Sequence, residues 1–266
     1  MKVVVPMAGL GTRFKEVSGK NPEYNRPKPF IRIRNIPMVC WATGSLPFPV
    51  VMSDLTFVIL AEHDRDFGIA DGLREIYSKE ANIIKLNKVT RGAAETAYAA
   101  RGFIDPDDEL IVSDSDHFFD GSFLAESIKN KDADTVGVIP VFLPPDDGIA
   151  RWSYSLIKKR NYIEAVGEKD VELMKQGAKA NIGAYYFSQG RYFLQEVEEV
   201  IRKNDLTGSE GKKEFYVAPI YDRLIRKGLK VQAAFIPQVW GLGTPQDLEV
   251  FLNTCSVSEP LSLRRV

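Results

Sequence analysis

The chain has 266 residues, a length that fits one large α/β domain or two smaller ones. Its residues are 44% hydrophobic and 27% charged, which is ordinary for a globular protein, and its formal net charge is −1. So balanced a charge gives no global field that would recruit nucleic acid or an acidic membrane. We find no run of about 18 apolar residues and no secretory leader, so we predict neither a membrane span nor export, and we expect a cytoplasmic protein.

Short apolar runs alternate with helical patterns through the first half of the chain. We expect strands at 3–5, 55–61, 83–86, 110–113 and 135–141, and helices at 37–46, 64–77 and 93–103. This alternation is typical of α/β proteins and predicts a Rossmann-like, doubly wound sheet that is mixed but mainly parallel, with helices on both faces. Ligands bind such sheets outside the carboxyl ends of the strands.

The second half begins with more strand-like patterns. We expect a hairpin formed by 152–158 and 162–166, a strand at 180–187, helices at 192–203 and 214–227, a strand at 231–236 and a helix at 245–252. The glycine- and charge-rich segment 205–213 predicts a mobile loop. Without a linker signal, residues 1–255 are interpreted as one domain, and 256–266 as a loosely held tail.

A glycine loop follows the first expected strand. Val3–Val5 lead through Pro6 into Ala8-Gly9-Leu10-Gly11-Thr12-Arg13. Glycines at a strand end let backbone N–H groups approach an anion, and an arginine adds a planar fork that suits phosphate oxygens. The segment therefore predicts a polyphosphate site, although it is neither a dinucleotide fingerprint nor a Walker loop, and an ordinary glycine turn is the alternative.

Three further segments carry candidate site chemistry. Lys28 lies between two prolines, so it is either a positioned charge for phosphate or an incidental surface lysine. Asp114 and Asp116 follow the strand at 110–113, where they can hold Mg²⁺ or cap a turn. The small residues of 90–97 leave room for a flat ring, or form a good helix start.

Together these segments resemble the sugar-1-phosphate nucleotidylyltransferases, also called NDP-sugar pyrophosphorylases. Pro6–Phe14, Arg26–Phe30 and Ser115–Gly121 carry the resemblance, which covers most of the chain. It implies the nucleotide-diphospho-sugar transferase fold, with a nucleotide-binding half over 1–130 and a sugar-binding half over 131–255. The activity it implies is the joining of a nucleoside triphosphate to a sugar 1-phosphate, with release of pyrophosphate.

The resemblance also implies roles for individual residues. Catalysis would rest on Arg13, Lys28 and Asp116, and the Mg²⁺ cofactor on Asp116 with Asp114. Nucleotide binding would involve Ala8, Gly9, Gly11, Thr12, Arg13, Asn87, Gly92 and Ala93. The phosphorylated acceptor would contact Gly148, Glu168, Lys169 and Asn181. Family members often self-associate, so a homo-oligomer stays open.

One segment departs from the family pattern. Trp240-Gly-Leu-Gly-Thr-Pro245 lacks the second metal-binding Asp, so either Asp114 compensates or Asp116 and the substrate hold the metal alone. A related cytidylyltransferase that acts on a non-sugar phosphate such as phosphocholine is therefore a serious alternative. A GT-A glycosyltransferase, suggested by Asp114-Ser115-Asp116, and an inactive nucleotide-binding homologue are weaker ones.

Overall fold

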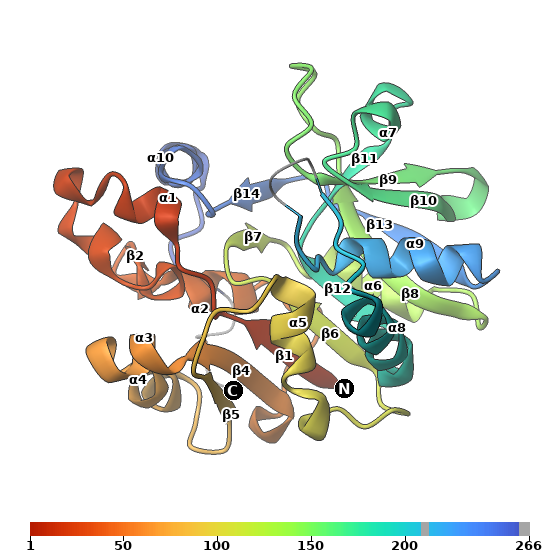
Figure 1. Ribbon diagram of the computed structural model, residues 1–266. Helices are drawn as coiled ribbons and strands as arrows, with labels where there is room; N and C mark the ends of the chain where they lie inside the picture. The colour runs from red at the N-terminus through yellow and green to blue at the C-terminus, as the bar shows by residue number, and fades with distance from the viewer. Residues whose placement is uncertain (209–212, 261–266) are drawn as a thin grey trace.

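A computed structural model describes residues 1–208 and 213–260, and within them one sheet of ten strands forms the centre of the molecule (Figure 1). The strands of this sheet are β1 (Lys2–Pro6), β4 (Leu55–Leu60), β5 (Asn82–Leu86), β6 (Leu110–Ser113), β8 (Thr135–Phe142), β9 (Ser153–Ile157), β10 (Ile163–Glu168), β11 (Lys179–Asn181), β12 (Ala184–Phe187) and β13 (Lys230–Phe235). Their order is β10-β9-β11-β8-β12-β6-β1-β4-β5, and β13 pairs with β8.

The direction of the strands confirms the predicted mixed, mainly parallel sheet. Strand β1 pairs in parallel with both β4 and β6, and β5 continues that run beyond β4. Strand β12 is antiparallel to β6 and to β8, and β10 and β11 are likewise antiparallel to their neighbours. The strands β10, β11 and β12 therefore run in one direction, and all the other strands of the sheet run in the opposite direction. The three reversed strands all lie in the second half of the chain.

Helices cover both faces of the sheet. They are α1 (Thr12–Lys15), α2 (Met38–Thr43), α3 (Ala61–Phe67), α4 (Ile69–Ile76), α5 (Ala93–Tyr98), α6 (Ser122–Lys129), α7 (Val171–Lys175), α8 (Gly190–Lys203), α9 (Ala218–Arg226) and α10 (Pro245–Thr254). In β1, Val4 faces the core beneath α5, α8 and α9, whereas Val3 and Val5 face the core beneath α2, α4 and α6. This alternation buries β1 on both sides, as its unbroken apolar sequence predicts.

Local backbone geometry explains where the expected elements differ from the observed ones. The helix expected over 64–77 is two helices, because Gly68 adopts a left-handed conformation between α3 and α4. The strand expected over 180–187 is likewise interrupted between β11 and β12. The last helices also shift, since α9 begins at Ala218 and α10 continues to Thr254. Of the loop predicted to be mobile, residues 209–212 lie outside the described ranges.

Two small sheets were not expected from the sequence. Strands β2 (Arg32–Ile33) and β3 (Ile36–Pro37) form a hairpin, and β7 (His117–Phe119) pairs with β14 (Val239–Gly241). The β7–β14 pairing joins segments about 120 residues apart, so no local pattern announces it. It brings the segment after Trp240 next to the end of β6.

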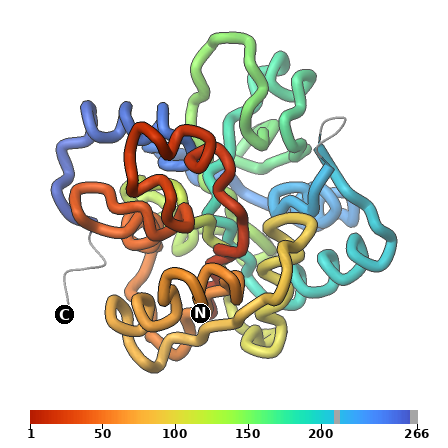
Figure 2. Tube along the Cα trace, turned by 60° about the vertical axis from the view of Figure 1, so that its left-hand side comes forward, coloured from red at the N-terminus to blue at the C-terminus, as the bar shows by residue number. Residues whose placement is uncertain are grey.

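Helix α10 packs against the N-terminal quarter of the chain, and Figure 2 shows the two segments side by side. Phe14, Trp41 and Phe251 belong to one buried cluster there. The Arg34 guanidinium donates to the carbonyl of Cys255 at 2.7 Å and also to that of Val257. These bonds hold the backbone as far as Val257, and residues 261–266 of the predicted tail lie outside the described residues.

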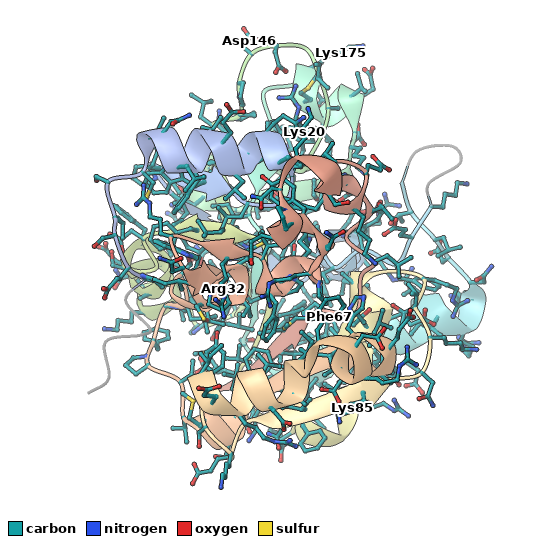
Figure 3. The ribbon with its side chains drawn as sticks, turned by 90° about the vertical axis from the view of Figure 1, so that its left-hand side faces the viewer. Lys20, Arg32, Phe67, Lys85, Asp146 and Lys175 are labelled. Carbon is teal, nitrogen blue, oxygen red and sulfur yellow. The ribbon has the colours of Figure 1, made fainter. Side chains whose placement is uncertain are left out.

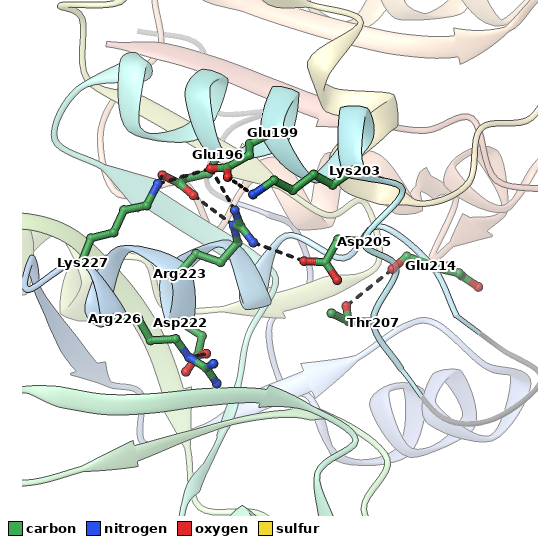
Figure 4. A network of polar contacts seen from close by, with 10 residues as sticks. All are labelled: Glu196, Glu199, Lys203, Asp205, Thr207, Glu214, Asp222, Arg223, Arg226 and Lys227. Carbon is green, nitrogen blue, oxygen red and sulfur yellow. Dashed lines mark hydrogen bonds and ion pairs between the residues drawn. The ribbon is translucent and has the colours of Figure 1, made fainter.

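The edge strand β10 is shielded by α9. The Asp222 carboxylate accepts a hydrogen bond from the Val166 backbone N–H at 3.1 Å and pairs with Arg226 at 2.6 Å. Figure 4 shows the polar network that joins α8 to α9, in which Arg223 pairs with the buried Glu196 at 3.0 Å. Within the described ranges, no helix is both long enough and apolar enough to cross a bilayer.

Candidate active site

A cavity of about 580 Å³ opens at the carboxyl ends of β1 and β6, the edge where the sequence predicted ligand binding. It brings together the glycine loop, Lys28, the small-residue turn and the two aspartates, which are far apart in the sequence. The described residues that line it include Met7, Ala8, Gly9, Leu10, Lys28, Pro29, Val89, Thr90, Arg91, Gly92, Ala93, Asp114, Ser115, Asp116, Lys213, Glu214 and Tyr216.

Lys28 and Asp116 form an ion pair inside this cavity. Lys28 begins a short 3₁₀ turn, Lys28–Phe30, and its ammonium lies 2.7 Å from Asp116 Oδ2. Gly11 has a φ of +65°, and a Cβ on it would come within 3.2 Å of Lys28 Cβ, so glycine lets the loop approach this turn. Burial opposes ionisation of Asp116, but the charge and hydrogen bond of Lys28 outweigh it and lower the pKa of the carboxyl.

Asp114 is ionised less readily than its neighbour. Burial raises its pKa to about 7, and the nearby negative charge of Asp116 adds to that rise. Its backbone N–H donates to Gly183 O at 2.6 Å, and a Cβ on Gly183 would lie 2.0 Å from Asp114 Oδ2. The break between β11 and β12 therefore makes the room in which this carboxylate sits.

His117 follows Asp116 but does not look like a proton-transfer group. Its side chain is buried against Phe119, with ring centroids 5.5 Å apart, and its ring nitrogens have no hydrogen-bond partner among the described residues. Burial lowers its pKa to about 4, so the imidazole is neutral at pH 7. We interpret His117 as part of the packing of β7.

The carboxylates suit a single Mg²⁺ ion that also binds phosphate. Within the described ranges no set of three or more acidic, His or Cys side chains forms a cluster that could hold a metal. Asp114 and Asp116, however, raise the cost of each other's charge, and Mg²⁺ binds through one or two carboxylates with substrate phosphates and water. The residues present therefore fit this ion.

The Trp240–Pro245 segment lies beside Asp116 without supplying an acid. Leu242 N–H donates to the Asp116 carbonyl at 2.8 Å, and a Cβ on Gly243 would lie 2.6 Å from Asp116 Oδ2. The carboxyl group of Asp247 comes close to Gly241, but it accepts from the Thr244 hydroxyl at 2.7 Å at the start of α10. The second carboxylate near Asp116 is thus Asp114, from the end of β6.

Glu168 and Lys169 lie at the end of β10. The Glu168 side chain is 9% exposed, and burial raises its pKa to about 7 although the Lys169 ammonium lies 3.8 Å away. Lys169 has a φ of +51°, its N–H donates to Trp152 O at 2.9 Å, and its ammonium donates to the Tyr216 hydroxyl at 3.2 Å. Glu168 and Tyr216 also line a second cavity of about 360 Å³. Tyr216 thus borders both cavities.

The fold that contains these two cavities is shared with proteins of known structure. No protein-family model matches the sequence, and no curated protein matches it. Among solved structures, the nucleoside-diphosphate-sugar pyrophosphorylase from Vibrio cholerae RC9 is 22% identical with a TM-score of 0.73, and the match covers 95% of this chain and 100% of that chain. A putative glucose-1-phosphate thymidylyltransferase from Bacillus anthracis, in complex with a sucrose, is 17% identical with a TM-score of 0.70, covering 100% and 96%.

A third similar structure is the inositol-1-phosphate CTP transferase from T. maritima. It is 17% identical with a TM-score of 0.67, and the match covers 96% of this chain and 97% of that chain. The chain has the nucleotide-diphospho-sugar transferase fold. The fold predicted from the sequence is therefore confirmed over nearly the whole chain, while the chemistry must be argued from the site.

Within this nucleotide-diphospho-sugar transferase fold, several residues predicted for the nucleotide lie outside the described cavity lining. Gly11 does not line the cavity, but its left-handed backbone lets the glycine loop approach Lys28. Thr12 and Arg13 are exposed on α1, although the Arg13 charge is close enough to help lower the pKa of Asp116. Asn87 is exposed just beyond β5. Contacts between these side chains and a nucleotide remain predictions.

Two residues predicted for the acceptor are also placed away from both cavities. Asn181 is the buried last residue of β11, where its amide accepts from Ser155 Oγ of β9 at 2.7 Å and donates to Ser153 Oγ at 3.0 Å. Gly148 belongs to the long loop between β8 and β9, and Figure 3 shows Asp146 of that loop far out from the body of the molecule. The placement of Asn181 favours a supporting role inside the sheet.

Sequence reasoning missed Tyr216 and Lys213, which both line the main cavity. They lie in a segment that was expected to be loop and helix, and a tyrosine at a helix start carries no functional signal. What could have drawn attention to them is the two consecutive aromatic residues, Phe215 and Tyr216, immediately after a glycine-rich stretch.

Proposed function

We propose that this chain is a nucleotidyltransferase that joins a nucleoside triphosphate to a sugar 1-phosphate, giving an NDP-sugar and pyrophosphate. The observation that carries the proposal is the Lys28–Asp116 pair, 2.7 Å apart, beside a glycine loop at the end of β1. Such an arrangement offers cations and backbone donors to phosphates and a carboxylate to a divalent ion. The similar structures, named for nucleotidyl transfer to sugar or inositol phosphates, support the same reading.

In the proposed reaction a phosphate oxygen of the acceptor attacks the α-phosphorus, and the bond to the bridging oxygen of the β-phosphate breaks. Catalysis then depends on position and charge rather than on a protein nucleophile. The N–H groups of the glycine loop and Arg13 would hold the leaving pyrophosphate, while Lys28 would stabilise charge on the α-phosphate. Mg²⁺, when held by Asp116 and Asp114, supplies further positive charge to the phosphate oxygens.

On the acceptor side, Lys169 would bind the incoming phosphate and Glu168 would accept hydrogen bonds from acceptor hydroxyl groups. The Lys169 side chain is 26% exposed and its ammonium contacts Tyr216, which borders both cavities, while Glu168 borders the second cavity. We propose that the turn at Gly92 and Ala93 holds the nucleotide base, and that the side-chain amide of Asn87 forms hydrogen bonds with the edge of that base. Gly148 would border the acceptor from the β8–β9 loop.

A second candidate keeps the chemistry and changes the acceptor. The structure from T. maritima is named for inositol 1-phosphate and CTP, which shows that this fold serves a non-sugar acceptor in another protein. In the present chain the lining of the second cavity includes the apolar residues Val166, Val200 and Ile220 beside charged residues such as Glu168 and Arg223. A cytidylyltransferase acting on a phosphorylated polyol or on phosphocholine is therefore the alternative worth testing beside the main proposal.

The experiment is a pyrophosphate-release assay with Mg²⁺, in which each nucleoside triphosphate is combined with sugar 1-phosphates, inositol 1-phosphate and phosphocholine. Release that requires one particular pair would establish the transferase and name its substrates. Triphosphate binding without release for any acceptor would contradict catalysis and favour an inactive nucleotide-binding protein. Consumption of a finished sugar nucleotide without pyrophosphate would favour a glycosyltransferase instead.

A cytoplasmic location is part of the same proposal. Cys40 and Cys255 are both buried and neither forms a disulfide, as expected for a protein kept in a reducing compartment. Fractionation of the source cells, followed by detection of the chain, would test this expectation.

A further inference from the structure

A short segment, Lys213–Tyr216, lies between the small-residue turn and Lys169, and we call it the strap. Its first part is held by Thr207, whose backbone N–H donates to Glu214 O at 3.0 Å and whose carbonyl accepts from Glu214 N–H at 2.9 Å. The Thr207 hydroxyl also donates to Glu214 O (Figure 4). The strap then runs along the rim of the main cavity, where Lys213, Glu214 and Tyr216 contribute to the lining.

Phe215 fixes the strap to the turn that was predicted to hold the base. Its N–H donates to Arg91 O at 2.9 Å, and its carbonyl accepts from Ala94 N–H at 2.8 Å. A Cβ on Gly92 would lie 2.5 Å from Phe215 N, and Gly92 has a φ of +149°, so only glycine permits this contact. The Arg91 guanidinium also covers the Phe215 ring, 4.7 Å from its centroid.

The next residue, Tyr216, holds Lys169. The Tyr216 hydroxyl accepts from the Lys169 ammonium at 3.2 Å, and the same ammonium lies 5.2 Å from the centroid of the tyrosine ring. At its other end Lys169 is fixed by its left-handed backbone and its bond to Trp152 O. The lysine is thus held at its backbone by Trp152, the residue before β9, and at its charged end by the strap.

We propose that Tyr216 is a positioning residue for Lys169, and that the clasp between Phe215 and the Gly92 turn sets where Tyr216 stands. The proposal rests on the proposed function in one respect, namely that Lys169 receives the acceptor phosphate. Phe215 and Tyr216 then connect the Gly92 turn to Lys169, because a shift of the Phe215 backbone moves the Tyr216 hydroxyl with it.

The first test compares Tyr216→Phe with Tyr192→Phe, which removes a hydroxyl on α8 for which the described residues offer no hydrogen bond. We expect Tyr216→Phe to raise the KM for the acceptor about tenfold, as for the loss of a hydrogen bond to a charged group, with the KM for the triphosphate unchanged. Equal changes in both KM values, or no change in either, would contradict a positioning role. Tyr192→Phe should behave like the unmodified chain.

A second readout does not need turnover, so it remains informative if the proposed function fails. Acetic anhydride labelling of Lys169, followed by mass spectrometry, reports how freely its amine reacts. Removal of the Tyr216 hydroxyl should raise Lys169 labelling several-fold, with exposed lysines such as Lys20 as internal references. Labelling equal to that of the unmodified chain would overturn the assignment whatever the activity.

The clasp itself is tested by Gly92→Ala against Gly228→Ala. Both positions have positive φ values, +149° and +83°, but a Cβ on Gly228 meets nothing within 4 Å. Both variants therefore carry backbone strain, and Gly92→Ala alone pushes the strap. We expect Lys169 labelling to rise in Gly92→Ala and to stay unchanged in Gly228→Ala. An equal response of the two variants would show that strain, and not the clasp, governs Lys169.

Discussion

Asp116 and Glu168, two carboxylates at opposite ends of the candidate site, have pKa values that are shifted in opposite directions. At the parallel end, the Asp116 carboxylate has Lys28 at 2.7 Å and its pKa is lowered. At the antiparallel end, Glu168 lies 3.8 Å from Lys169, and its pKa is raised to about 7. The Asp116 charge is thus balanced by a cation of the protein, whereas Glu168 is not balanced in this way, and neither is Asp114, whose pKa is also raised to about 7. The comparison shows that a close cation, and not burial alone, decides whether a carboxylate of this site is ionised.

The most direct test of this difference between Asp116 and Glu168 removes Lys28, the cation beside Asp116. In Lys28→Ala we expect turnover to fall by roughly a hundredfold or more, because a positioned charge at a reacting phosphate is lost. The free energy of unfolding should also fall, by roughly 1–3 kcal/mol, because the mostly buried Asp116 carboxylate loses its cation and its hydrogen bond. Pyrophosphate release and urea unfolding measure the two quantities.

The control for this substitution is Lys20→Ala, which removes an exposed lysine from the same part of the chain (Figure 3). It should leave turnover unchanged. Near-normal turnover in Lys28→Ala would remove Lys28 from the proposed chemistry, and with it the argument that the parallel end is built for phosphate.

Asp114 and Asp116 allow a second test, because both follow β6 but their pKa values are shifted in opposite directions. Asp116→Asn should raise the Mg²⁺ concentration needed for half-maximal turnover roughly tenfold or more, and Asp114→Asn should raise it less. Mg²⁺ titrations of both variants test the order, and chelation by EDTA should abolish turnover in the unmodified chain. A larger effect of Asp114→Asn would make Asp114 the principal ligand.

The carboxylate at the antiparallel end should make stability depend on pH. Glu168 has a pKa of about 7 in the folded chain against 4.5 for the ordinary group, so its favourable contribution is complete below pH 4.5 and is lost as pH rises through 7. Glu168→Gln should therefore gain stability relative to the unmodified chain between pH 4.5 and 8, by up to roughly 3 kcal/mol.

Urea unfolding at the two pH values measures this gain, and Glu172→Gln, which changes a 75% exposed side chain, is the matched control. If the difference between Glu168→Gln and the unmodified chain stays constant with pH, the carboxylate is already stabilised in the folded protein. The contrast between the two ends would then disappear.

The smallest expected effect concerns Asn181, which the resemblance assigned to the acceptor. Loss of its bonds to Ser153 and Ser155 should lower the free energy of unfolding by about 1–3 kcal/mol in Asn181→Ala. The acceptor KM should change little, because the amide is directed into the sheet. A raised acceptor KM with unchanged stability would instead restore the direct contact.

Sequence patterns predicted the parallel end of the site better than the antiparallel end. The glycine loop and Asp116 follow directly from strand ends, whose local sequence announces a turn, and their meeting point follows from the parallel sheet. Tyr216 could not be predicted, because its position depends on a backbone clasp between residues about 120 apart. The same holds for the break at Gly183, which accommodates the Asp114 carboxylate from another strand.

The hydrogen bond from Val166 to Asp222 has a consequence outside the site. An edge strand with free amides is a template on which another chain can add a strand and begin to aggregate. Asp222 accepts from one of these amides on β10, and its pairing with Arg226 holds the carboxylate at that position. Helix α9, which borders the second cavity, thus also helps to prevent the sheets of two neighbouring molecules from pairing edge to edge.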